Sequence, residues 1–247
     1  YLKVIQWWMQ DNILYRENWP DHIHGFVKGR SALTNARAHY GSKHVLNVDI
    51  KDFFPSIKAD SVEHLFREFG YNRSVSRQIS DLCTFEGSLP QGAPTSPTIS
   101  NFVAFTLDSE LKSLSNRHRL IFTRYADDIT FSGNSYISFE VYYDVKKVIE
   151  KNGFSVNERK VRFSGPGDRM DVTGLVINEK PQMSRAWRNR VRAIFDQAKK
   201  NPHLFSDSVD TLCGYIGMIA TYDGYENSAL YKKGLEAIDI INSYNRF

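Results

Sequence analysis

Two adjacent aspartates, Asp127 and Asp128, are the residues of this sequence whose types and spacing most clearly suit chemistry. They lie between two β-branched and aromatic runs, 120–125 and 129–132, which predicts a β-hairpin with both carboxylates at its tip. Adjacent like charges repel each other, so they are tolerated in water or beside a divalent cation. A solvated turn is the alternative interpretation, because aspartate is a favoured turn residue.

A third aspartate, Asp49, lies near the end of a segment, 44–50, that alternates apolar and polar residues. The alternation predicts a strand on which Val45, Asn47 and Asp49 share one face. A carboxylate at the end of a buried strand needs a cap, a cation or a metal, and a purely structural role stays open. If this strand pairs with the hairpin, the three carboxylates meet. Such a cluster suits two divalent cations that activate a 3′-hydroxyl and stabilise an in-line displacement at phosphorus.

Magnesium is the cation that fits this cluster best, because it prefers oxygen ligands and keeps positions open for phosphate and water. A structural calcium site is the alternative, although no segment has the spacing of an EF-hand loop.

Composition limits the class of protein. The 247 residues are 41% hydrophobic, which is enough for one large or two modest domains. Lys and Arg number 32 against 28 acidic residues, and this mildly basic balance permits a nucleic-acid partner without requiring one. No apolar run approaches the roughly 20 residues that span a membrane, and no signal peptide is recognisable. We therefore expect a cytoplasmic protein with no membrane partner, in which Cys83 and Cys213 are reduced core thiols.

The pattern of the remaining residues predicts the elements that must hold the carboxylates. Strands are expected between about 44 and 178, with helices inserted among them and appended after them, which indicates an α+β body with a helical C-terminal part. Besides the strands named above, we expect strands at 154–156, 161–164 and 170–178. Helices are expected at 2–13, 31–38, 60–69, 74–85, 98–115, 139–152, 184–200, 207–221 and 227–245.

Three blocks of the sequence resemble motifs of reverse transcriptases, in the same order. NVDIKDFFPSI (47–57) is similar to their first aspartate motif, LPQGAPTSP (89–97) to the nucleotide-pocket motif, and YADD (125–128) to the signature hairpin. Two shorter elements resemble those of bacterial retron reverse transcriptases. The segment 35–39 matches the NAxxH element, and 172–174 matches the VTG element.

This resemblance implies that Asp49, Asp127 and Asp128 are catalytic residues that hold two Mg²⁺ ions, with the carbonyl of Ile50 as a further ligand. Lys160 lies where related enzymes carry a lysine near the leaving pyrophosphate, so it would act as general acid. A solvated surface lysine is the alternative at that position.

The resemblance also implies a pocket for a deoxynucleoside triphosphate. Asp52 and Phe53 would offer backbone amides to the phosphates, and Phe54 would block a ribose 2′-hydroxyl. Gln91 would contact the sugar, and Gly92 would permit its close approach. A plain core position is the alternative interpretation of the Phe54 ring.

Contacts to RNA or DNA are expected from the two retron-like elements and from one basic helix face. The strand at VTG would grip the primer end, and arginines at i, i+3 and i+7 share one face of the helix 184–200. A solvated basic face is the alternative for these arginines. Trp187 is expected to pack inward, which is the more common role of such a residue, and stacking on a base is its alternative. The expected contact residues are Asn35, His39, Thr173, Gly174, Arg185, Arg188 and Arg192.

The fold that the resemblance implies is a right-hand polymerase with a palm sheet, partial fingers and a helical thumb. The expected parts are partial fingers with the NAxxH element at 1–43, palm at 44–58, fingers helices at 59–92, palm again at 93–178, and thumb at 179–247.

The activity that the resemblance implies is reverse transcription of a structured noncoding RNA, which serves as template and primer, into an RNA-linked single-stranded DNA. Retron systems resemble antiphage defence modules, so an effector protein is a further expected partner. Another bacterial reverse transcriptase, of group II intron or defence type, is the first alternative. A non-catalytic RNA-binding scaffold with the same fold is the second.

One family element has no counterpart in this sequence. Related enzymes carry a basic fingers hairpin resembling K-K-x-G-x-x-R ahead of the first helix, whereas this sequence begins at Tyr1 inside a helical pattern. We expect either a truncated sequence or loss of the element. Since that hairpin supplies cations to the triphosphate, residues 1–247 in isolation are expected to bind nucleotide poorly.

Overall fold

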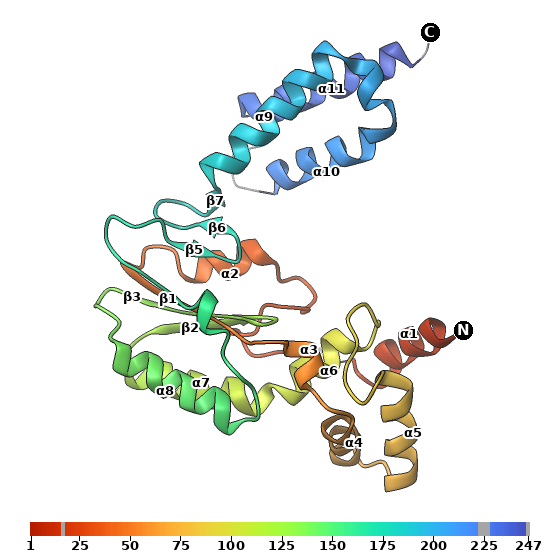
Figure 1. Ribbon diagram of the computed structural model, residues 1–247, viewed down its shortest axis with the longest axis vertical. Coiled ribbons are helices and arrows are strands. Elements are labelled where there is room, and N and C mark those ends of the chain that lie inside the picture. Colours follow the sequence, from red (N-terminus) through yellow and green to blue (C-terminus); the bar gives the residue numbers. More distant parts are fainter. Residues whose placement is uncertain (16–17, 222–227, 246–247) are drawn as a thin grey trace. The chain divides into compact units, whose positions relative to one another are not determined.

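The computed structural model describes residues 1–15, 18–221 and 228–245 (Figure 1). The chain forms two compact units, Tyr1–Thr173 and Gly174–Phe247. The first unit combines helices with a sheet, and the second is mainly helical. The α+β class expected from the sequence is therefore confirmed.

A four-stranded antiparallel sheet forms the centre of the first unit. Its order is β2-β3-β1-β4, and its strands are β1 (His44–Asp49), β2 (Ile121–Tyr125), β3 (Asp128–Gly133) and β4 (Arg162–Ser164). β1 pairs with β3 over its whole length, in a register that places Asp49 opposite Asp128. The first strand therefore does pair with the hairpin, which is the condition for the three carboxylates to meet.

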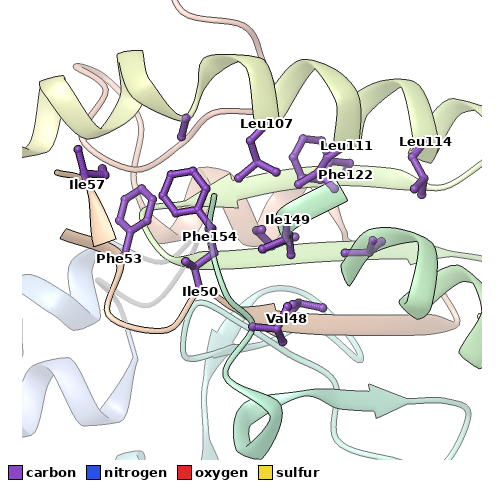
Figure 2. Close-up of a cluster of buried hydrophobic side chains, with 14 of the residues drawn as sticks. Val48, Ile50, Phe53, Ile57, Leu107, Leu111, Leu114, Phe122, Ile149 and Phe154 are labelled. Carbon is purple, nitrogen blue, oxygen red and sulfur yellow. The ribbon is translucent and has the colours of Figure 1, made fainter. Parts of the chain in front are cut away.

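The apolar face of this sheet, called the helix face here, is covered by α7 (Phe105–Arg117) and α8 (Phe139–Lys151) (Figure 1). Figure 2 shows Val48 and Phe122 from the strands among Leu111 and Ile149 from the two helices. Strand alternation assigns the other side chains of this face. The strand residues of the helix face include Leu46, Val48, Phe122, Arg124, Ile129, Phe131 and Phe163.

The opposite face, called the polar face here, carries mostly hydroxyl, amide and carboxylate groups. Its strand residues include Asn47, Asp49, Thr123, Asp128, Thr130 and Ser132. Helix α2 (Ala32–Ala38) lies on this side, and its start is fixed by a capping box between Ser31 and Thr34. A face of this composition holds its shape through hydrogen bonds rather than through apolar packing.

Shorter helices extend the first unit beyond the end of β1. They are α1 (Leu2–Asn12), α3 (Phe53–Ser56), α4 (Ala59–Glu68), α5 (Arg73–Cys83) and α6 (Ser96–Val103). The single helix expected at 98–115 is wrong, because α6 and α7 are separate helices that meet at Ala104, where ψ is 2°. The apolar periodicity continues through Ala104 and does not reveal the break.

The strand expected at 170–178 is also interrupted. β5 (Asp171–Val172) ends at Thr173, and β6 (Leu175–Val176) begins after Gly174. Thr173 and Gly174 have φ values of 46° and 80°, so the VTG element is a tight turn rather than a continuous strand. Glycine adopts this conformation easily, whereas a β-branched threonine is strained in it.

The second unit packs three helices around its own core. β6 pairs with β7 (Gln182–Met183), and the chain continues through α9 (Arg185–Lys200), the 3₁₀ segment η2 (Pro202–Ser208), α10 (Val209–Ala220) and α11 (Ala229–Tyr244). The helix expected to begin at 207 thus starts as a 3₁₀ turn, and residue 227 of the last expected helix lies outside the described residues. Gly234 permits close packing, since a Cβ there would lie 2.9 Å from the Phe195 ring.

Both cysteines are free thiols. Cys83 is buried as expected, whereas Cys213 is exposed and does not belong to the core. Within the described ranges, we find no helix with the length and apolarity needed to cross a membrane.

Candidate active site

The hairpin that carries the paired aspartates turns one residue earlier than the sequence predicts. Tyr125 pairs with Asp128, so Ala126 and Asp127 form the turn and Asp128 is the first residue of β3. Ala126 has a φ of 58°, a left-handed conformation that is uncommon for a residue other than glycine. The expectation that both aspartates form the tip is therefore corrected, because the alanine takes the first turn position.

The three aspartates nevertheless come together at one end of the sheet. Asp49 and Asp128 are cross-strand partners, and opposed residues of an antiparallel pair place their side chains on the same face. The backbone N–H of Ile50 donates to the carbonyl of Asp127 at 3.0 Å, which ties the hairpin tip to the end of β1. Asp49 is 5% exposed, Asp127 is half-buried and Asp128 is exposed.

Burial and, after it, the charges of neighbouring carboxylates set the pKa values of this group. Desolvation raises the pKa of Asp127, and the charge of Asp49 raises it further. Desolvation, followed by the charges of Asp127 and Asp49, raises the pKa of Asp128 to about 6, although its side chain reaches solvent. The Lys160 ammonium lies 2.7 Å from Asp49 Oδ2, and this bond raises the pKa of the lysine. The Lys160 ammonium is therefore a cation that already contacts one of the three carboxylates.

A divalent cation fits the chemistry of these donors. Three carboxylates and the nearby carbonyl of Ile50 are oxygen ligands of the kind that Mg²⁺ prefers, and the charges of neighbouring carboxylates add to the desolvation that raises the pKa of Asp127 and Asp128. Among the residues that the structure describes, however, no three His, Cys, Asp or Glu side chains are already gathered as a metal site. Asp49 is bonded to Lys160 instead.

An open cavity of about 720 Å³ adjoins the aspartates. It brings together residues that the sequence places far apart, from the first aspartate motif, the nucleotide-pocket motif and the segment before β4. The expected site residues in its lining are Asp49, Ile50, Asp52, Phe53, Phe54, Gln91, Asp127 and Lys160. Asp128 and Gly92 are not in this lining, and Gly92 borders a neighbouring depression that shares Phe54 and also contains Trp7.

The floor of the cavity is shaped by the turn after β1. Asp52 adopts a left-handed conformation with φ of 48°, and α3 begins immediately after it at Phe53. The Phe53 ring is buried and packs against Phe154 at 5.7 Å between centroids, so only its backbone is suited to meet a ligand. Phe54 is half-buried and lies 5.9 Å from the ring of Phe26. Phe54 is therefore both a packing residue and a wall of the cavity.

Lys160 is held in place by a short 3₁₀ helix, η1 (Glu158–Lys160). The carboxylate of Glu158 accepts hydrogen bonds from the Tyr142 hydroxyl and the Lys146 ammonium, both on α8. Sequence reasoning missed Lys51, Asn157, Glu158 and Arg159, which also line the cavity. The polar run at 157–160 between two apolar segments was the available signal.

The NAxxH element is not exposed to a ligand. Asn35 and His39 are both fully buried. His39 Nδ1 lies 2.7 Å from Ser132 Oγ and its Nε2 lies 2.7 Å from Thr123 Oγ1, so the ring bridges β3 and β2 on the polar face. The expectation that these two residues contact nucleic acid directly does not agree with their burial, and both position other parts of the protein.

Asn35 connects the two retron-like elements. Its Nδ2 donates to Thr173 Oγ1 at 3.3 Å, and the Thr173 hydroxyl donates to the carbonyl of Ala32 at 3.2 Å. NAxxH therefore holds the turn of VTG in place. Thr173 itself is half-buried and Gly174 is exposed, so both can be reached from solvent.

The arginines expected to bind nucleic acid lie on α9. Arg185 and Arg192 are exposed, and Arg188 is half-buried. Arg192 donates to Asn189 on its own helix at 2.8 Å. Trp187 packs against Tyr215 and the core of the second unit, in agreement with the inward packing expected for it.

Comparisons with known proteins identify the family. Residues 1–186 match the family model described as reverse transcriptase (RNA-dependent DNA polymerase). The retron Ec86 reverse transcriptase of Escherichia coli is 35% identical over 93% of this chain and 71% of its own length. The retron Mx162 reverse transcriptase of Myxococcus xanthus is 36% identical over 90% of this chain. The chain spans only about half, 53%, of that Myxococcus relative.

A likeness in fold extends to a more distant polymerase. The telomerase of Candida albicans, solved with a fragment of telomeric RNA, matches with a TM-score of 0.50 and 9% identity over 98% of this chain and 51% of that one. This likeness supports the right-hand polymerase fold. Members of the family use divalent metal ions, which agrees with the carboxylate donors at the end of β1. The chain therefore belongs to the reverse transcriptases, the RNA-dependent DNA polymerases, and within them to the retron type.

Proposed function

We propose that Asp49, Asp127 and Asp128 are the catalytic residues of this polymerase and that they hold two Mg²⁺ ions, with the carbonyl of Ile50 as a further ligand. The observation that carries the proposal is the register of Asp49 opposite Asp128, beside a cavity that also contains Gln91 and Lys160. Mg²⁺ would supply charge stabilisation at phosphorus and lower the pKa of a primer hydroxyl.

The other cavity residues would select and position a deoxynucleoside triphosphate. Phe54 would exclude a 2′-hydroxyl, and Gln91 would contact the sugar while Gly92 admits it closely. The backbone amides of Asp52 and Phe53 lie at the turn where phosphates would approach. Lys160 would leave Asp49 and donate a proton to the departing pyrophosphate.

The wider activity that we propose is that of a retron system. The protein would copy a structured noncoding RNA into an RNA-linked single-stranded DNA in the cytoplasm, and it would act with an effector protein in antiphage defence. Support comes from the retron relatives and from the NAxxH and VTG elements, which bond to each other through Asn35 and Thr173.

In this proposal the named parts keep their sequence-based ranges. They are fingers at 1–43 and 59–92, palm at 44–58 and 93–178, and thumb at 179–247. Thr173 and Gly174 would meet the primer strand. Arg185, Arg188 and Arg192 would meet nucleic-acid phosphates, because they lie on one helix whose charge is basic.

The test is primer extension on an RNA template with Mg²⁺ and labelled deoxynucleotides. Residues 1–247 are compared with a form extended upstream to include any natural fingers segment, and each form is also made as Asp127→Asn/Asp128→Asn. We expect synthesis by the extended form, loss of synthesis by at least a thousandfold in its double variant, and unchanged RNA binding. A double variant that still extends the primer would overturn the catalytic assignment. An extended wild-type form that binds RNA without synthesis would favour a scaffold.

A further inference from the structure

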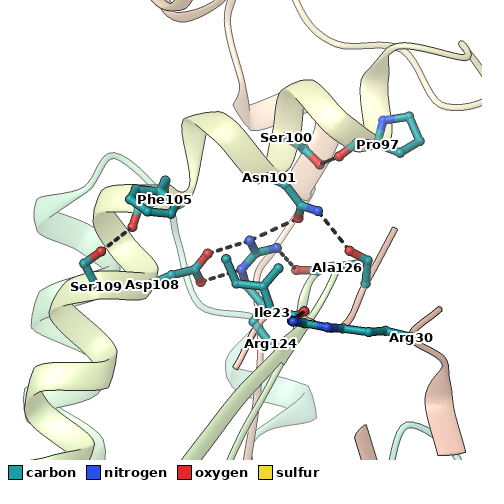
Figure 3. Close-up of polar contacts among 11 residues, drawn as sticks. Ile23, Arg30, Pro97, Ser100, Asn101, Phe105, Asp108, Ser109, Arg124 and Ala126 are labelled. Carbon is teal, nitrogen blue, oxygen red and sulfur yellow. Dashed lines mark hydrogen bonds and ion pairs between the residues drawn. The ribbon is translucent and has the colours of Figure 1, made fainter. Parts of the chain in front are cut away.

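Arg124 is a fully buried arginine one residue before the end of β2, the strand that leads into the turn with Asp127. Its Nε and Nη2 atoms each lie 2.6 Å from an oxygen of Asp108 on α7, which is also fully buried (Figure 3). A buried ion pair of this kind adds little net stability compared with apolar residues of the same volume. Its position beside the hairpin therefore suggests another role.

The remaining donors of the guanidinium reach the catalytic turn. Nη1 donates to the carbonyl of Ala126 at 3.0 Å, and Nη2 donates to Asn101 Oδ1 on α6 at 3.1 Å. Asn101 in turn donates from Nδ2 to the carbonyl of Gly25 at 2.9 Å. Figure 3 shows these contacts as one connected group around Arg124. One planar side chain thus joins two helices to the turn that contains Asp127.

A second segment, residues 22–25, contacts the turn that Ala126 and Asp127 form. Residues 22–25 run beside β2, where His24 N–H donates to the carbonyl of Arg124 at 2.8 Å. Gly25 lies directly against the turn, because a Cβ at this position would be 2.2 Å from the nitrogen of Ala126. The segment is itself fixed by Arg30, which donates to the carbonyls of residues 19, 20 and 23.

Ala126 needs such support. Its left-handed backbone conformation, with φ of 58°, persists in a non-glycine residue only where the surroundings hold it. The carbonyl of Ala126 is bonded to Arg124, and its nitrogen faces Gly25. Both sides of the strained residue are therefore constrained, and the next two residues in the chain are Asp127 and Asp128.

We propose that Arg124, oriented by Asp108 and Asn101, is a positioning residue for DNA synthesis and that it acts with Gly25 to clamp Ala126. The clamp fixes where the Asp127 and Asp128 carboxylates stand relative to Asp49. This inference rests on the proposed roles of those aspartates. Because a displacement of about 1 Å at reacting groups lowers a rate by roughly a hundredfold, loosening the turn affects catalysis more than folding.

The first test replaces the ion pair without leaving a buried charge alone. The paired variant Arg124→Met/Asp108→Leu is made in the form of the protein that synthesises DNA, and its melting temperature is measured beside single-nucleotide addition. We expect a folded protein whose maximal rate falls by roughly 10- to 100-fold, with the KM for nucleotide changed less than about threefold. The Mg²⁺ concentration for half-maximal rate rises as well. A folded paired variant with the wild-type rate and Mg²⁺ dependence overturns the proposal.

The second test moves the turn while the ion pair stays intact. Gly25→Ala places a methyl group against the Ala126 backbone, whereas the matched control Gly133→Ala, at the far end of β3, meets the side chain of Leu120 at 2.8 Å and comes no closer to backbone than 3.8 Å. We expect Gly25→Ala to lower the maximal rate at least tenfold more than Gly133→Ala when both are compared per folded molecule. Equal rates in the two variants contradict the clamp.

Failure of this inference can be told from failure of the proposed function. If Asp127→Asn/Asp128→Asn abolishes synthesis and both clamp tests leave the rate unchanged, only the positioning role is lost. If Asp127→Asn/Asp128→Asn still synthesises DNA, the catalytic assignment of these aspartates is wrong, and the positioning role proposed for Arg124 and Gly25 is wrong as well.

Discussion

On the helix face of the sheet, Phe122 and Phe131 stack at 5.1 Å between centroids and fill the space under α7 and α8. The one charged strand residue there, Arg124, is neutralised by a buried carboxylate. On the polar face, His39 bridges two hydroxyls, and Asp49 bonds a lysine whose side chain is 59% exposed. The two faces differ in how easily their polar contacts can be exchanged. Arg124 and Asp108 are both fully buried and keep each other as partners, whereas the exposed Lys160 can exchange Asp49 for another anion.

The largest effect expected on stability comes from breaking the helix face. Phe131→Ala removes a fully buried ring, so the free energy of unfolding should fall by about 3–5 kcal/mol. The measurement is denaturant unfolding, with DNA synthesis expressed per folded molecule. Synthesis should change little, because the ring lies on the face away from the carboxylates. Ile121→Ala, 41% exposed on the neighbouring strand, is the control and should cost far less. Equal losses would contradict the division between the faces.

A smaller loss of stability, together with a clear effect on rate, is expected from Lys160→Met. The lysine side chain is largely exposed but its partner Asp49 is buried, so the variant should lose some stability, and its rate is compared per folded molecule. If the lysine donates a proton to pyrophosphate, nucleotide addition should slow by about 100-fold. The measurement is single-turnover addition, with Lys147→Met as control, since the Lys147 side chain is 78% exposed and is not part of the cavity lining. If Lys160→Met adds nucleotide at the same rate as Lys147→Met, Lys160 is a surface lysine and not a general acid.

The polar face should also make stability depend on pH. Burial lowers the pKa of His39 from its usual 6.5 to about 3, so the folded state holds this ring neutral. An unfolded chain takes up a proton below about pH 6.5 and the folded chain does not, so this contribution is complete above pH 6.5 and is lost as pH falls toward 3. We expect about 2 kcal/mol less stability at pH 5 than at pH 7 from this residue.

The check is denaturant unfolding at both pH values in the wild type and in His39→Gln. The variant should be less stable at pH 7 and should lose less on acidification. His24, whose pKa burial also lowers, to about 4, contributes in the same direction, so His24→Gln serves as a parallel measurement. A His39→Gln protein with the full wild-type pH dependence would show that the imidazole is not what titrates.

The sequence predicted β1 and the hairpin from alternation and most residues of the cavity lining from motifs that occupy contiguous residues, whereas the pairing of β1 with the hairpin entered only as a condition. It misplaced the hairpin turn by one residue. Turn chemistry favours Asp127 and Asp128 as turn residues, and nothing local says that Ala126 will adopt a positive φ. That conformation is imposed by Gly25 and Arg124, which local propensity cannot include.

The same limit explains the errors on the polar face. Asn35 and His39 were expected at nucleic acid because of the resemblance of their segment to the NAxxH element, yet Asn35 on α2 and His39 at the end of that helix are both fully buried. The signal for Arg124 was present, since one arginine interrupts an otherwise β-branched and aromatic run. Its partner, Asp108, lies 16 residues earlier on a helix, and no spacing rule relates a helix position to a strand position across a core.

The smallest effect on stability is expected from removing the hydrogen bond between Asn35 and Thr173. The bond from Asn35 to Thr173 is neutral and long, at 3.3 Å, and the Oδ1 atom of Asn35 is buried with no partner among the described residues. Removing the amide therefore removes an unsatisfied acceptor together with the bond, and Asn35→Ala should cost only about 1 kcal/mol. Thr173→Val removes the hydroxyl and keeps the strained, β-branched backbone, so the double-mutant cycle isolates the bond. A coupling energy of about 0.5–1 kcal/mol is expected, and a coupling near zero would mean that the VTG turn is held by its packing alone.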